Sequence, residues 1–287
     1  MSNAVAIASD SSIDLPLSEA ANRGIAVASI QVAFSTEFFR DTDLPRTELY
    51  RRLKDEPRLP TIAAAMPADF VAAYKQAAER GEKILCLINP FESCSTYTSA
   101  YTASVAMKKE KDIPIDVMNT GRALTGLGAT AIAAAQMAAR GATIEQVIGA
   151  IEDATPRIDS YYAPATSKYL QRDGRISLYE MQVGSLDGML PLIRVWGRVA
   201  VIEKHRTQAE NIDRMFDRAH EQLGNRDSVV IVTHADNPSG ARELADRLRK
   251  TLNCKELLVT ELGPSAGAYC GEGTIGIGFC PLLTQLN

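Results

Sequence analysis

Short apolar runs alternate with amphipathic segments over the first half of the chain. Val5–Ala8, Ile84–Ile88 and Pro114–Met118 have the length of single buried strands, and each is followed by a polar turn and then by a segment with helical spacing. Ala123–Arg140 reads as an alanine-rich helix that ends at Gly141. Strands that alternate with helices predict a mostly parallel sheet with flanking helices and right-handed crossovers.

The pattern changes near residue 157. Leu190–Val195 and Arg198–Ile202 predict a hairpin, and helical segments then alternate with strand-like segments toward the C-terminus. We therefore predict an α/β protein of two domains, an N-terminal α/β domain over residues 1–156 and a C-terminal α/β domain over residues 157–287.

Composition and charge narrow the class of protein. Hydrophobic residues make up 46% and charged residues 23% of the chain, which is typical of a soluble globular protein. The net charge of -4 and the lack of a basic run argue against a nucleic-acid partner. No apolar run approaches the roughly 20 residues that span a bilayer. Five cysteines without CxxC spacing argue against a zinc site or a disulfide framework. We expect a cytoplasmic protein without a membrane span.

One stretch has the pattern of an anion receptor. The apolar run Ile84–Ile88 leads into the small polar side chains of Ser93, Cys94, Ser95 and Thr96, and a helix follows. The free N–H groups and the positive end of the helix dipole attract an anion at such a point. A thiol there is a candidate nucleophile because its thiolate is stabilised. The favoured interpretation of Cys94 is a small residue that lines a pocket, since no base is evident beside it.

Other polar clusters admit two interpretations each. Asp10 and Asp14 follow the first strand and could hold a metal, but capping of backbone N–H groups is favoured. His234–Pro238 joins a strand to a helix and predicts an N-cap with proline at the first helical position, or a crevice-lining turn. The glycine-rich segment 262–278 lacks the order of a dinucleotide-binding motif, so close backbone approach to a ligand or to the other domain is favoured.

Several short motifs, taken in chain order, resemble those of the DegV family. The resemblance runs from residue 8 to residue 273 and so covers nearly the whole chain. The matching segments are Ala8–Pro16, Phe39–Asp43, Thr96–Ala100, Tyr169–Ser177, His234–Pro238, Leu262–Pro264 and Gly271–Gly273.

This resemblance implies a two-domain DegV-like fold and a bacterial, non-enzymatic fatty-acid-binding protein without a cofactor. In that family the acyl chain lies in an apolar tunnel of the N-terminal domain, with its carboxylate near the domain interface. Each buried methylene contributes roughly 0.8 kcal/mol, so the tunnel would supply most of the affinity. The resemblance also implies a partner, a fatty acid kinase that makes an acyl phosphate for phospholipid synthesis.

The same resemblance assigns the head-group positions. It places Ile62 at the family's head-group threonine, Cys94 at its head-group serine, and Tyr269 at a histidine associated with phosphotransfer. Arg206 matches an arginine that helps to engage the kinase. Thr61, Ser93 and Ser95 are candidates to supply substitute hydroxyls. The predicted ligand-binding residues are Thr61, Ile62, Ser93, Cys94, Ser95 and Tyr269, and the predicted partner-binding residue is Arg206.

Because three head-group positions carry altered side chains, alternatives to a fatty acid carrier stay open. One is a divergent family member that binds another lipid-like ligand and serves no kinase. Another is an acyl-transfer or hydrolytic enzyme that uses Cys94, and a third is an interaction module with a vestigial pocket.

Overall fold

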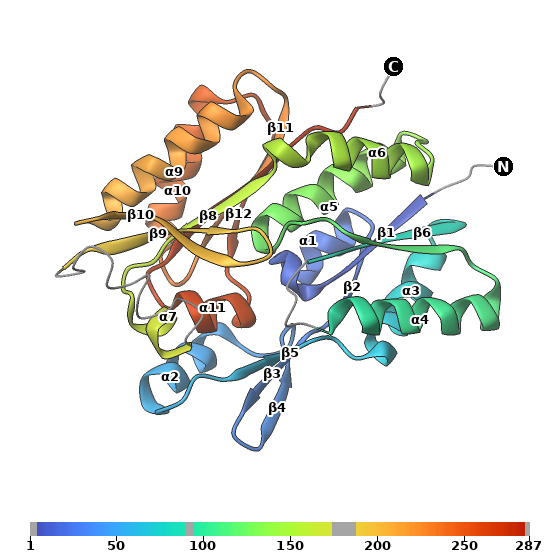
Figure 1. The fold of residues 1–287 in the computed structure, drawn as a ribbon, viewed down its shortest axis with the longest axis horizontal. Helices are drawn as coiled ribbons and strands as arrows, with labels where there is room; N and C mark the ends of the chain where they lie inside the picture. The colour runs from blue at the N-terminus through green and yellow to red at the C-terminus, as the bar shows by residue number, and fades with distance from the viewer. Residues whose placement is uncertain (1–4, 90–94, 174–187, 285–287) are drawn as a thin grey trace.

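The structure, a computed structural model, describes residues 5–89, 95–173 and 188–284. Figure 1 shows two main sheets with helices packed between and outside them, and a small third sheet beside α2. A mixed α/β fold with a parallel sheet and a second sheet was predicted, and the structure confirms it.

The first sheet is parallel throughout, with the strand order β2-β1-β6-β7. Nearly every residue of β1 and β6 is buried, as expected for central strands with both faces covered. The strands are β1 (Val5–Asp10), β2 (Ile25–Ala28), β6 (Lys83–Ile88) and β7 (Ile115–Asn119). Its helical elements are η1 (Ser11–Ile13), α1 (Leu17–Asn22), α3 (Pro67–Ala78), α4 (Thr96–Lys111) and α5 (Leu124–Ala139).

A small antiparallel sheet lies below the first, in the order β4-β3-β5. Its strands and the helix beside them are β3 (Gln31–Phe34), β4 (Glu37–Arg40), β5 (Thr61–Ala63) and α2 (Arg46–Asp55). The third strand, β5, carries one of the walls of the cavity described below.

The second main sheet has six strands in the order β10-β9-β8-β13-β11-β12, and only β11 and β12 run parallel. The predicted hairpin is confirmed as β9 and β10. Figure 1 shows α9 and α10 together on the outer face of the sheet. The strands are β8 (Asp159–Ala163), β9 (Leu190–Val195), β10 (Val199–His205), β11 (Ser228–His234), β12 (Cys254–Glu261) and β13 (Ile275–Pro281). The helices are α6 (Ile144–Ala154), η2 (Thr155–Arg157), α7 (Lys168–Asp173), α9 (Gln208–Leu223), α10 (Pro238–Thr251) and α11 (Pro264–Cys270).

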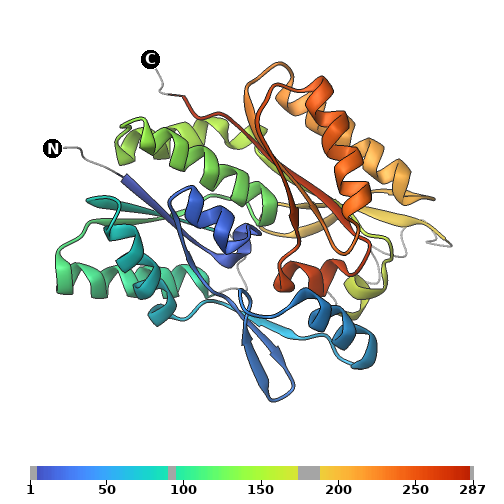
Figure 2. The ribbon, with the colours of Figure 1, turned by 180° about the vertical axis from the view of Figure 1, so that it is seen from behind.

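Helix α5 packs between the two main sheets (Figure 2). Glycines allow α5 to pack closely against η1 and β13. A Cβ at Gly128 of α5 would lie 2.3 Å from the carbonyl oxygen of Ile13, and a Cβ at Gly278 of β13 would lie 2.3 Å from the backbone of Thr125. Ile7 of the first sheet and Ile231 of the second belong to the same buried cluster as α5. The sheets therefore share a core, and the division at residues 156/157 stays a prediction.

The predicted caps at Asp10 and within His234–Pro238 are present, and a further cap begins α6. Thr143 forms a capping box with Gln146 at the start of α6, and the side chain of Asn237 accepts a hydrogen bond from Gly240 N–H at the start of α10. Asp10 caps η1 by accepting from Ser12 N–H at 2.9 Å. Among the described residues, no group of three or more His, Cys, Asp or Glu side chains is arranged to hold a metal ion.

The glycine-rich segment near the C-terminus contains a helix that the sequence analysis did not predict. This helix, α11, begins with Pro264 at its first position and packs against α2. A Cβ at Gly267 would lie 3.0 Å from Leu49 and 3.1 Å from the hydroxyl of Tyr50. The predicted close backbone approach is therefore found at Gly267, and its partner is α2 in the N-terminal half of the chain.

We expect Gly128→Ala to destabilise the protein by about 1–3 kcal/mol, because the added methyl group would overlap the Ile13 carbonyl. Gly149→Ala on α6 is the matched control, since no atom lies within 4 Å of the added Cβ, and it should stabilise by up to about 1 kcal/mol. Urea unfolding of both variants measures the two values. Equal stabilities would contradict the close packing of α5.

Candidate binding cavity

A cavity of about 350 Å³ lies where β1 and β6 end, between the first sheet and the elements of the second half of the chain. The carboxyl ends of parallel strands are a common position for ligand sites in α/β folds. The lining residues are Ser12, Ile30, Ile62, Ala63, Ala64, Asn89, Ser95, Thr96, Leu124, Leu170, Ile193, Val195, Val199, Ser265, Ala266, Tyr269 and Cys270.

Most of the lining is apolar. Ile30 and Ile62 contribute one wall, and Ile193, Val195 and Val199 of the β9–β10 hairpin contribute the facing wall. The two walls come from the predicted N-terminal and C-terminal domains. Such a lining binds an apolar chain by burial of its surface.

The polar lining residues sit at the ends of β1 and β6 and at the start of α4 and α11. Asn89 Nδ2 donates to Ser12 Oγ at 3.0 Å, and the Ser12 hydroxyl donates to Asp10 Oδ1. Thr96 and Ser265 are also buried at this end of the cavity. The cavity therefore has apolar walls and a polar end, which is the arrangement that an amphipathic ligand requires.

Two buried carboxylates hold the start of α11 against the first half of the chain. Asp14 Oδ1 accepts a hydrogen bond from Gly263 N–H at 2.6 Å, and Asp41 Oδ1 accepts one from Ser265 N–H at 2.7 Å. These contacts fix α11, which carries Tyr269 and other lining residues.

Burial changes the acidity of these groups. It raises the pKa of Asp10 to about 6 and that of Asp14 to about 7, although hydrogen bonds from Ser12 and Gly263 act in the opposite direction. The pKa of Asp41 is raised by the same cause. Burial likewise raises the pKa of the cavity-lining Cys270 thiol to about 12, so this thiol is protonated at neutral pH and is a poor nucleophile.

The structure brings some of the predicted ligand-binding residues together. Ile62, Ser95 and Tyr269 all line the cavity. Thr61 is exposed on β5 and does not line it. Ser93 and Cys94 lie outside the described residues, so their predicted roles are not tested.

Four polar residues of this region, in two pairs, were missed. Ser12 follows β1 and Asn89 follows β6, and these two strands are parallel neighbours in the sheet. Their positions after the two strands could have predicted that the side chains meet. Asp41 and Ser265 are 224 positions apart, and no local pattern connects them.

Arg206 is exposed at the end of β10, away from the cavity. Val199, at the other end of β10, lines the cavity, and seven strand residues at about 3.4 Å each separate Arg206 from Val199 by roughly 24 Å along the strand. Arg206 therefore belongs to a different part of the surface.

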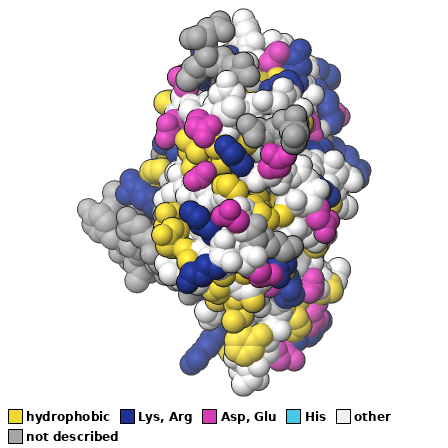
Figure 3. All heavy atoms as spheres, turned by 90° about the vertical axis from the view of Figure 1, so that its right-hand side faces the viewer, with side chains coloured by type: hydrophobic (Ala, Val, Ile, Leu, Met, Phe, Trp, Pro, Cys, Tyr) yellow, Lys and Arg dark blue, Asp and Glu magenta, His cyan; other side chains and the backbone are white. Residues whose placement is uncertain are grey.

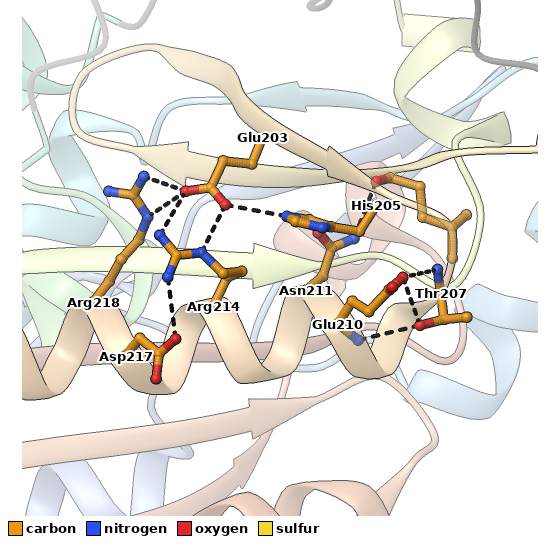
Figure 4. Close-up of polar contacts among 9 residues, drawn as sticks. Glu203, His205, Thr207, Glu210, Asn211, Arg214, Asp217 and Arg218 are labelled. Atoms are coloured by element: carbon orange, nitrogen blue, oxygen red, sulfur yellow. Dashed lines mark hydrogen bonds and ion pairs between the residues drawn. The ribbon is translucent and has the colours of Figure 1, made fainter.

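A network of charged side chains holds β10 to α9 beside this arginine (Figure 4). Glu203 binds Arg214, Arg218 and His205. Burial acts to raise the pKa of Glu203, but the hydrogen bonds from these three residues outweigh it and lower the pKa to about 2. Thr207 forms the N-terminal capping box of α9.

Figure 3 shows the face at the right-hand side of Figure 1, where acidic and basic side chains are interspersed among hydrophobic ones. The described residues of this face do not form an extended basic surface of the kind that binds nucleic acid. Within the described ranges, the structure contains no helix that could cross a bilayer.

Comparison with known proteins assigns the family. Residues 4–282 match the model of a family described as "Uncharacterised protein, DegV family", and the chain belongs to this family. A DegV domain-containing protein of Streptomyces coelicolor is 31% identical over 281 residues, which cover 96% of this chain and 98% of that protein.

Solved structures agree in fold. A DegV lipid-binding protein from Thermotoga maritima is 26% identical with a TM-score of 0.82, covering 98% of this chain and 99% of that one. A second Thermotoga maritima protein, described as revealing a fatty acid binding function, is 25% identical with a TM-score of 0.82, covering 97% and 99% of the two chains.

The buried carboxylates predict how stability depends on pH. Their folded-state pKa values lie above the ordinary 3.8, so between pH 4 and 7 the folded state binds more protons than the unfolded state. The free energy of unfolding should therefore fall as pH rises through this window. Asp14→Asn should flatten the fall, and Asp116→Asn, at an exposed position on β7, should not. Urea unfolding at several pH values measures the free energy of unfolding. A free energy of unfolding that rises from pH 5 to 7 would contradict the raised pKa values of the buried carboxylates.

Proposed function

We propose that this protein binds one long-chain fatty acid in the cavity between the two sheets. The acyl chain lies between the apolar walls, and the head group lies at the polar end beside Ser12 and Asn89. The observation that carries the proposal is a mostly apolar cavity with polar side chains grouped at the carboxyl edge of the parallel sheet. At roughly 0.8 kcal/mol per methylene, chain burial supplies most of the affinity.

The relatives support this ligand class. The Thermotoga maritima structures are described as lipid binding and fatty acid binding, and they match this chain over nearly its full length. The function described for these relatives is binding rather than catalysis. The proposal includes a cytoplasmic location, which agrees with the free state of all four cysteines in the described part of the chain.

A second part of the proposal is that the protein presents its fatty acid to a fatty acid kinase, with Arg206 in the contact surface. An exposed arginine held between the Glu203 network and the α9 cap is well placed to meet an acidic group on a partner. Arg206 does not line the cavity, so partner binding and lipid binding would use different residues.

A large side chain introduced into the cavity tests whether the fatty acid binds there. Ala64 is a half-buried lining residue, and Ala64→Phe should weaken binding of palmitic acid at least tenfold, because displacing two methylenes costs about 1.6 kcal/mol. Ala106→Phe, at an exposed position on α4, is the matched control and should bind normally. Isothermal titration with delipidated protein measures both affinities. Unchanged binding by the folded Ala64→Phe variant would place the ligand elsewhere.

The partner surface is tested separately. Arg206→Glu should leave palmitic acid affinity unchanged, because Arg206 does not line the cavity, and should weaken binding to a fatty acid kinase at least tenfold, because it reverses an exposed charge. Arg58→Glu, at another exposed arginine, is the control. Pull-down with a kinase from the source organism gives the readout, and equal retention of both variants would contradict the role of Arg206.

A further inference from the structure

The hydrogen-bonding state of the polar end restricts the form in which a head group can bind. Ser12 has one hydroxyl hydrogen, and it donates this hydrogen to Asp10 Oδ1. The amide of Asn89 donates to the Ser12 oxygen at 3.0 Å. A serine hydroxyl has one donor and two acceptor positions, so Ser12 has only an acceptor position left for a ligand.

Ser265 is in a similar state on the opposite side. Its backbone N–H donates to Asp41 Oδ1 at 2.7 Å, and its hydroxyl also hydrogen bonds to the Asp41 carboxylate. Two serines that line the cavity thus give their hydrogens to buried carboxylates. Toward the cavity, both hydroxyls act as acceptors.

The charges around this end disfavour a second anion. No Lys, Arg or His is among the described residues that line the cavity. Asp10 lies directly behind Ser12, and its second oxygen has no hydrogen-bond partner among the described residues. A carboxylate placed next to another buried carboxylate is destabilised, and one of the two groups then binds a proton. The positive end of α4 opposes this effect only modestly.

We propose that the cavity binds its fatty acid in the protonated, neutral form, with the ligand hydroxyl donating to Ser12 Oγ. This inference rests on the proposed function and specifies the chemical state of its ligand. It also predicts that a neutral lipid with a hydroxyl head group, such as a primary alcohol, occupies the same site.

The test compares decanoic acid with 1-decanol between pH 7.5 and 9.0. In this range Asp10 and Asp14, with pKa values of about 6 and 7, are mostly ionised, and Cys270 is protonated. The other titratable or charged groups around this end are Asp41, Arg46 and Tyr269. Binding of each probe to delipidated wild-type protein is measured by isothermal titration.

The expected result differs between the two probes. A free carboxylic acid has a pKa near 4 to 5, so its neutral form becomes about tenfold scarcer per pH unit, and the apparent Kd of decanoic acid should rise by about that factor. The Kd of 1-decanol should stay constant within about twofold. A Kd of decanoic acid that is independent of pH, or a failure of 1-decanol to bind while the acid binds, would overturn the inference and leave the proposed function standing. If neither of these probes nor palmitic acid binds, the proposed function fails as well.

Two variants give an independent readout. Asp10→Asn removes the charge behind Ser12 and supplies an amide donor, so it should strengthen decanoate binding at pH 8.5 at least fivefold. Ser12→Ala removes the acceptor and should weaken 1-decanol binding about fivefold. Ser104→Ala on α4, whose hydroxyl bonds to Tyr101 O outside the cavity, is the control. A folded Asp10→Asn protein that binds decanoate more weakly than wild type would contradict the assignment.

Discussion

The contact between two buried carboxylates and the start of α11 determines where the second wall of the cavity lies. Asp14 and Asp41 accept hydrogen bonds from backbone N–H groups that are 249 and 224 positions away in the chain. Burial of a carboxylate is costly, and these N–H groups offset the cost because they lie at the positive end of a helix. The two carboxylates in turn accept hydrogen bonds from N–H groups at the start of α11 that have no partner within the helix. The lining residues of α11 therefore keep a fixed position relative to the parallel sheet.

Helix α5 supplies the second constraint. Its alanine- and glycine-rich sequence lets both sheets approach closely, and side chains from β1 and β11 join it in one buried cluster. The shared core joins the two halves of the chain whose residues line the cavity, and burial between them supplies the binding energy of an apolar ligand. This agrees with a binding protein, in which the pocket itself is the functional element.

The chain belongs to the DegV family, and the motif resemblance predicts that Ile62 and Tyr269 stand at the family's threonine and histidine. Both residues line the cavity, so the altered side chains act on the ligand environment directly. The polar end instead offers Ser12, Asn89 and Ser265, which are held by buried acids. Asp10 and Asp41, which lie behind the lining serines, thus help to set which hydrogen bonds the site can offer a ligand.

Local physics made part of this structure predictable from sequence. Buried strands such as β1 and β6, the N-cap at Asn237, and the β9–β10 hairpin each depend on neighbouring residues. The sequence motifs also grouped Ile62 and Tyr269, which both line the cavity. Helix α11 was missed because glycine-rich sequence has low helix propensity, and its carboxylate partners come from the other half of the chain. The exposed position of Thr61 and the pairing of Ser12 with Asn89 were likewise decided only by the tertiary structure. Contacts over such sequence separations depend on how strands and helices pack, and no local pattern records them.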